Sequence, residues 1–213
     1  MELSLPKIQK YYQYALYLSI FTIIANLIEG SVSVYFGYSD ETLALFGFGI
    51  DSFIEVISAI GITVMVLRLA QNNEGQRSKI ENLALHVTAI SFYLLTIGLI
   101  LSVIINLYQQ RTPESTQWGI IISIISISVM VVLMKLKIKV GNGLHSAPII
   151  ADANCTRACI YMSVVLLASS LLFSLTRIAY LDSIGAIGIA YYSFKEGREA
   201  WEKASRNTDC DCD

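Results

Sequence analysis

Charged residues are scarce in this sequence, and their scarcity decides the class of protein. Only 15% of the 213 residues are charged and 54% are hydrophobic, and the mean hydropathy is +0.58. These values lie well outside the usual range of a soluble domain. The formal net charge is −2, and the sequence contains no basic patch of the kind that binds nucleic acid. The composition therefore excludes a soluble domain and indicates an integral membrane protein with no nucleic-acid partner.

Histidine and cysteine are also few. The two histidines, His86 and His145, lie near the predicted cytoplasmic ends of apolar segments, where an imidazole is expected to be solvated rather than bound to metal. Of the four cysteines, two lie within an apolar segment and two in a predicted cytoplasmic tail, a reducing compartment. Structural disulfides are therefore not expected, and metal binding or thiolate chemistry is the more natural use. A cleavable signal peptide is not expected either, because charged residues precede the first segment without a small-residue cleavage pattern.

What the sequence has in abundance is long apolar runs. A membrane-spanning helix needs about 20 mostly apolar residues, and six segments qualify: 11–37, 41–69, 84–109, 117–137, 147–174 and 178–195. Lys and Arg collect in cytoplasmic loops, and twelve of the fifteen fall on one side of this arrangement, among them Lys135, Lys137 and Lys139 after the fourth segment. We predict an all-α, polytopic membrane protein with six transmembrane helices and both termini in the cytoplasm. One transmembrane domain is expected over 1–203, followed by a short tail over 204–213.

Ligand-type side chains recur at helical spacing inside two of these segments. Asp51 and Glu55 are four residues apart, so they lie on one face of the second segment. Cys155 and Cys159 have the same spacing on the fifth segment. Asp152 falls on the stripe of the two cysteines, whereas Arg157 is expected to point well away from it. Two pairs of potential ligands on two antiparallel helices indicate a metal site more strongly than any one of these residues does alone.

The predicted depths bring the two pairs together. At 1.5 Å per residue, Asp51 lies about 15 Å from the external end of its segment, and Cys159 lies about 18 Å from the cytoplasmic end of its own. Both pairs therefore meet near the middle of the bilayer. Two carboxylates and two thiols, from Asp51, Glu55, Cys155 and Cys159, form a ligand set that suits Zn²⁺ or a softer ion such as Cd²⁺. Ca²⁺ and Mg²⁺ are poorly served by sulfur.

Other polar residues have open roles. A single intramembrane cysteine is usually a small hydrophobe, and an intramembrane acid can belong to a structural ion pair, here with Arg157. We expect accessory or proton-relay roles for Asp152, Glu29, Asn26 and Asp182, with a helix-start role as the alternative for Asp182. Cys210 and Cys212 in the terminal "DCDCD" are candidates for weak metal capture.

Two stretches of the sequence resemble those of a known family. The stretch "GFGIDSFIEVIS" and the stretch "SAPIIADANCTRACIYMS" resemble the cation diffusion facilitator family of divalent-metal antiporters. In that family the second span carries an acid pair and the fifth carries a His and an Asp after "ADA"; here Cys155 and Cys159 stand at those two positions. Typical members also continue into a cytoplasmic ferredoxin-like domain, so this chain resembles a short branch that lacks it. A dimer would then be held by membrane helices, with Ala89, Ser91, Thr96 and Gly98 of the third span as a plausible contact.

The resemblance and the ligand set lead to one expected function. We expect divalent transition-metal efflux from the cell, across a plasma or bacterial inner membrane, by alternating access and in exchange for protons, because bound metal displaces protons from its ligands. No enzymatic activity and no resident cofactor are expected. A metal sensor or scaffold that does not transport is the first alternative. A membrane thiol redox enzyme is a weaker one, because the cysteines are spaced C-x-x-x-C and no quinone, haem or flavin signature accompanies them.

Overall fold

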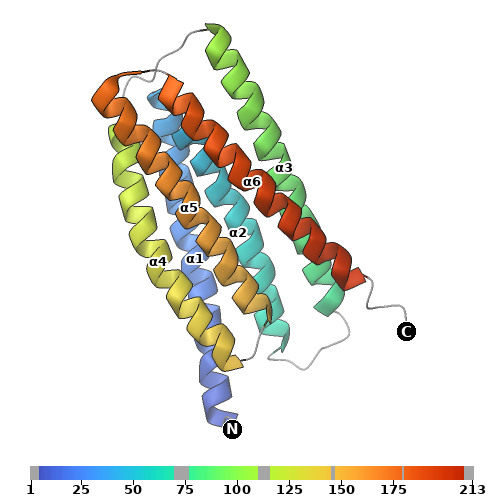
Figure 1. Ribbon diagram of the computed structural model, residues 1–213. Helices are drawn as coiled ribbons and strands as arrows, with labels where there is room; N and C mark the ends of the chain where they lie inside the picture. The colour runs from blue at the N-terminus through green and yellow to red at the C-terminus, as the bar shows by residue number, and fades with distance from the viewer. Residues whose placement is uncertain (1–4, 70–76, 110–115, 145–146, 179, 209–213) are drawn as a thin grey trace.

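A computed structural model describes residues 5–69, 77–109, 116–178 without 145 and 146, and 180–208 (Figure 1). Across these residues the chain forms helices and no strands. They are α1 (Leu5–Ser39), α2 (Leu43–Leu69), α3 (Arg77–Gln109), α4 (Gln117–Leu144), α5 (Ala147–Thr176) and α6 (Tyr180–Thr208). The expected all-α fold is confirmed, and the six helices coincide with the six apolar segments of the sequence.

Five helices contain stretches long and apolar enough to cross a membrane. These stretches are Lys10–Ser39, Leu43–Gly61, Ala89–Tyr108, Gln117–Leu144 and Thr156–Thr176. α6 is not among them, because only its first half is apolar and charged residues follow from Lys195 onward. The protein is therefore a polytopic membrane protein, and a sixth crossing by α6 stays a prediction.

The helices form one elongated bundle (Figure 1). The most extensive packing joins neighbours in pairs: α1 with α2, α4 with α5, and α3 with α6. α2 also packs against α3, α5 and α6, so it lies at the centre of the arrangement. The first turn of α1 and the last turn of α6 lie at the same end of the bundle, as expected if both termini face one compartment.

Large apolar side chains cover the outside of the bundle. On α3, Leu94, Ile97, Leu101 and Ile104 are each more than half exposed. The inside instead holds many small or polar side chains, including Ser19, Thr22, Asn26 and Ser33 along α1. This distribution is typical of membrane helices, which face lipid with bulky apolar residues and use small or polar residues at their contacts.

Glycines let α1 and α2 approach closely. A Cβ added to Gly49 of α2 would lie 2.7 Å from the backbone nitrogen of Val34 and 2.8 Å from its Cγ2. A Cβ on Gly37 of α1 would lie 2.5 Å from the backbone nitrogen of Phe46. Both distances are too short for any side chain. The close approach brings the polar face of α1 against the acidic face of α2.

Two of the four small residues of α3 expected at a contact between copies are buried inside the chain. Ala89 is fully buried, and Thr96 is 8% exposed with its hydroxyl within 3.5 Å of the Ala190 carbonyl oxygen. The expectation that Ala89 and Thr96 contribute to a dimer surface is therefore wrong. Their spacing on the helix is correct for a close contact, but the sequence did not show that α6 fills it. Gly98, by contrast, faces open space.

Candidate functional site: a buried carboxylate and thiol cluster

α2 and α5 bring three of the four predicted ligands together. Asp51, Glu55 and Cys159 are all buried. The Cys159 thiol donates a hydrogen bond to Glu55 Oε1 and lies 3.9 Å from Asp51 Oδ2. The i, i+4 spacing of the two acids places both carboxylates on the face of α2 that meets α5. Cys159 is a free thiol.

α1 contributes a fourth polar side chain to this group. The Asn26 amide donates a 2.8 Å hydrogen bond from Nδ2 to Glu55 Oε2. Asn26 is fully buried, and it bonds one oxygen of the Glu55 carboxylate while Cys159 bonds the other. We refer to Asp51, Glu55, Cys159 and Asn26 as the central cluster. Asn26 therefore contacts one of the predicted ligands, and its expected accessory role stays a prediction.

Glu29 lies beside the central cluster and is held by a hydroxyl group. Ser52, the neighbour of Asp51, donates a 3.0 Å hydrogen bond to Glu29 Oε1. Ser126 of α4 is joined to Ser163 at 3.0 Å, and Ser163 donates to the backbone carbonyl of Cys159 at 2.8 Å. Polar side chains of α4 and α5 therefore continue from the thiol-bearing turn of α5 across to α4.

Two oxygen atoms of the central cluster have no hydrogen-bond partner among the described residues. They are Asp51 Oδ1 and Asn26 Oδ1, and both are buried. Buried polar atoms normally have partners, and an exception indicates a missing ion, water or proton. In this conformation no set of three or more His, Cys, Asp or Glu side chains within the described part is arranged as a metal centre. The side chain of Cys155, the fourth predicted ligand, lies outside the described residues.

Asp152 forms a second buried polar group with a lysine. Lys137 Nζ lies 2.8 Å from Asp152 Oδ2 and 3.0 Å from Thr156 Oγ1, and the lysine side chain is only 2% exposed. The placement of Lys137 in a cytoplasmic loop after the fourth span is therefore wrong, because α4 continues to Leu144. The spacing held a signal of this burial. In a helix of 3.6 residues per turn, Lys135 and Lys139 share a face and Lys137 points the opposite way.

The two faces of α5 differ in exposure, as predicted. Arg157 is exposed, whereas Asp152, Thr156 and Cys159 are buried along one stripe. The stripe is the surface that α5 presents to the rest of the bundle. Among the described residues, the hydrogen bond of Glu29 is with Ser52, and no ion pair with Arg157 is found there.

Asp182 lies away from the central cluster and caps another helix. Its carboxylate accepts hydrogen bonds from the backbone nitrogens of Leu43 at 2.8 Å and Ala44 at 3.4 Å. These are the first free N–H groups of α2, where a carboxylate satisfies donors and complements the helix dipole. The expected helix-start position is found, because Asp182 lies in the first turn of α6, and its carboxylate in addition caps the start of α2. Contacts between helices this far apart in sequence leave no local pattern.

Of the two histidines, only His86 lies in the part of the chain that the structure describes. Its ring lies edge-on to Trp201, with 5.2 Å between the ring centroids. His145, Cys210 and Cys212 lie outside the described residues, so the expectations for them stay predictions.

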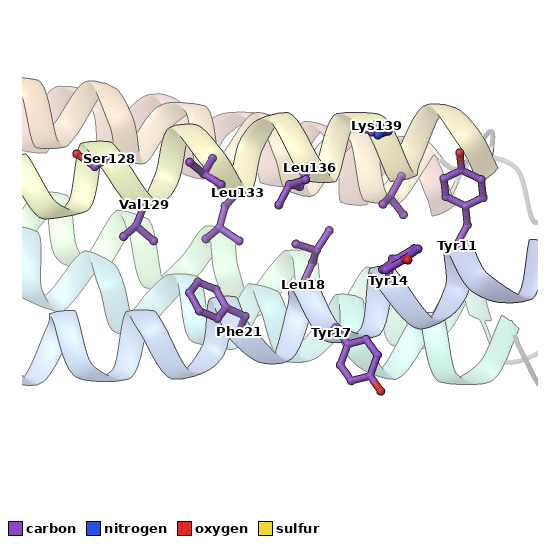
Figure 2. Close-up of a pocket in the computed structure, with 12 residues that line it drawn as sticks. Tyr11, Tyr14, Tyr17, Leu18, Phe21, Ser128, Val129, Leu133, Leu136 and Lys139 are labelled. Atoms are coloured by element: carbon purple, nitrogen blue, oxygen red, sulfur yellow. The ribbon is translucent and has the colours of Figure 1, made fainter.

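A cavity of about 960 Å³ lies between α1 and α4 (Figure 2). Its walls are apolar and aromatic, with Tyr11, Tyr14, Phe21 and Leu133 among them and Lys139 at one end. It contains none of the predicted metal ligands. The groove thus belongs to the outer surface of the bundle and not to the polar interior.

Comparison with known proteins assigns a family. The model of the cation efflux transmembrane domain matches residues 19–206, which includes every residue of the central cluster. No curated protein matches the sequence. The family model covers most of the chain and agrees with the helical membrane fold described above. The chain therefore belongs to the cation efflux family, whose members are transporters of metal cations.

Proposed function

We propose that this cation efflux protein exports Zn²⁺ or a softer divalent ion such as Cd²⁺ in exchange for protons. The proposal rests on the contacts that the buried side chains of Asp51 and Glu55 make with Cys159. Acids inside a membrane bundle are costly and are functional by default. Two carboxylates and a thiolate combine borderline and soft ligands, which favours Zn²⁺ and Cd²⁺ over Ca²⁺ and Mg²⁺. Cys155, one turn before Cys159 on α5, is the proposed fourth ligand.

Proton exchange follows from the chemistry of these ligands. The thiol of Cys159 and the carboxyl group of Glu55 are hydrogen-bonded to each other, and such a bond needs one proton within the pair. A divalent ion requires deprotonated ligands, so its binding releases protons. When the ion leaves, protons restore the hydrogen-bonded cluster and remove the charge that would otherwise stay uncompensated within the bilayer. Protons are therefore the counter-ion in this proposal.

Transport by alternating access fits the antiparallel packing of α2 and α5. The ligands are divided between the two helices, so a small movement of one against the other opens or closes the cluster. We propose that metal reaches it from the cytoplasm and leaves on the opposite side, in a cell membrane, and that the protein works as a homodimer held by its membrane helices. No resident cofactor takes part.

Metal flux in vesicles tests this function. Purified protein in proteoliposomes is expected to move Zn²⁺ or Cd²⁺ saturably, and Cys155→Ala combined with Cys159→Ala is expected to abolish the flux. Thr176→Ala, an exposed change on the same helix, serves as the matched control. Unchanged flux in the double variant would refute the ligand assignment. Binding without flux for every ion would instead favour the sensor or scaffold.

A further inference from the structure

The buried lysine of α4 occupies a position that needs an explanation beyond helix packing. An ammonium group removed from water is costly even when it is paired, and apolar residues of similar size often join helices equally well. Lys137 is 2% exposed and contacts two oxygen-bearing side chains of α5, Asp152 and Thr156. Thr156 in turn donates to the Asp152 backbone carbonyl at 3.1 Å, which keeps its hydroxyl oxygen turned to the lysine. Lys137 thus completes a cation site built from a carboxylate and a hydroxyl.

This group lies on the same stripe of α5 as the central cluster, toward the end where α1 begins. Thr156 and Asp152 precede Cys159 by three and seven residues, or about 4.5 and 10 Å along the helix axis. All three side chains are buried. The two groups therefore lie about two helical turns apart on one buried face of α5.

We propose that Asp152 and Thr156 form a second cation site, on the cytoplasmic approach to the central cluster, where the Lys137 ammonium stands in for the transported ion. This inference rests on the proposed transport function and adds a step to it. An arriving divalent ion competes with the ammonium for the Asp152 carboxylate and, carrying twice the charge, repels it from this position. The ion then moves about two helical turns to the central cluster.

The ammonium group is attached to α4 through the Lys137 side chain, and this attachment favours movement of the ion in one direction. Once the ion has moved on, the ammonium returns to Asp152 and closes the path behind it. A divalent ion competes for the carboxylate better than a monovalent one, so the lysine also excludes Na⁺ and K⁺. A lysine that only joined α4 to α5 would have neither consequence.

Metal binding to variants of the full chain tests the proposal directly. Equilibrium dialysis with Zn²⁺ and with Cd²⁺ would compare wild type, Lys137→Met, Lys137→Arg and the double variant Lys137→Met with Asp152→Asn, all carrying Ser at 210 and 212. Lys137→Met is expected to bind an additional ion per chain. Lys137→Arg, which keeps the cation, and the double variant, which lacks the carboxylate, are expected to bind none in addition. No gain in Lys137→Met, or a gain that persists in the double variant, would overturn the proposal.

Transport kinetics separate this role from a structural one. In Lys137→Met the ion is held at the second site, so we expect the apparent KM for cytoplasmic metal and kcat to fall together, each by roughly tenfold, equivalent to about 1.4 kcal/mol. A structural role would lower the amount of folded protein and leave KM unchanged. Lys137→Gln, whose amide can still donate to Asp152, is the second variant if Lys137→Met does not fold, and a KM equal to that of wild type in it would count against the proposal.

The two proposals fail in different ways. The additional ion is read as a difference between Lys137→Met and its double variant, and it requires no flux and no particular set of central ligands. If the protein transports but the additional ion is absent, the second site is wrong and the function stands. If the additional ion appears without flux in any protein, the transport function is wrong and the cation site stands.

Discussion

At the scale of single residues, spacing revealed the groups that share a helix face and missed those that meet only through the fold. The four-residue spacing of Asp51 and Glu55, and of Cys159 with its neighbour, needed only helical periodicity to be read. The bond from Asp182 to the start of α2 joins positions 138 and 139 residues apart, so no local pattern contains it. Lys135, Lys137 and Lys139 lie close together in the sequence, so the positive-inside rule assigns all three to a cytoplasmic loop. Only the fold shows that Lys137 is buried.

Asn26 gives the prediction at this scale. Its amide holds Glu55 Oε2 at 2.8 Å, and loss of a side chain that orients a metal ligand typically costs 10- to 100-fold in affinity. We expect Asn26→Ala to raise the apparent KM for Zn²⁺ flux by at least about tenfold. Ser31→Ala is the control, because Ser31 lies on an exposed face of the same helix and bonds only to its own backbone among the described contacts. Equal KM values for the two variants would remove Asn26 from the site.

At the scale of helices, apolar length located all six but misjudged several ends. α1 begins at Leu5 and α3 at Arg77, each earlier than its apolar segment, and α6 continues to Thr208. Polar residues can extend a helix beyond the hydrocarbon region, since its hydrogen bonds are internal, and hydropathy does not register such turns. On α6 the extension carries pairs spaced i, i+4, such as Arg198 with Glu202 at 2.8 Å, which suit a solvated helix.

The close contact of α1 with α2 gives the prediction for elements. A Cβ on Gly49 would press on Val34 at 2.7 Å, so we expect Gly49→Ala to destabilise the bundle by about 1–3 kcal/mol, as overpacked cores do. Gly98→Ala is the matched control, because its Cβ meets nothing within 4 Å and alanine favours a helix by about 0.5–1 kcal/mol over glycine. Thermal unfolding in detergent measures both. A Gly49→Ala protein as stable as Gly98→Ala would mean that α1 and α2 are not so closely packed.

At the scale of the whole molecule, an even number of helices and the distribution of Lys and Arg predicted termini on one side. The first turn of α1 and the last turn of α6 do lie at the same end of the bundle (Figure 1). Which compartment that end faces is a matter of charge, since Lys and Arg follow the positive-inside rule. The packing partners of α3 and α6 could not be read from sequence, because every span has apolar faces that fit several neighbours.

Thiol labelling tests the orientation. In a protein with Ser at 155 and 159, a membrane-impermeant maleimide is expected to leave Cys210 and Cys212 unlabelled in intact cells and to label them after permeabilisation. Ser39→Cys, at the exposed end of α1, is expected to be labelled in intact cells when the tail cysteines are replaced by Ser. The reverse pattern would place the termini outside and reverse the proposed direction of transport.

Metal and protons are proposed to exchange where α2 and α5 meet inside the bundle. The most direct measurement is stopped-flow uptake of Zn²⁺ and Cd²⁺ into proteoliposomes that contain a pH-sensitive dye, with wild type and Asp51→Asn at equal protein content. We predict saturable metal flux with protons moving the opposite way, and loss of both signals in Asp51→Asn, whose amide is a poor substitute for the carboxylate. Metal flux without proton movement, or equal flux in Asp51→Asn, would contradict the account.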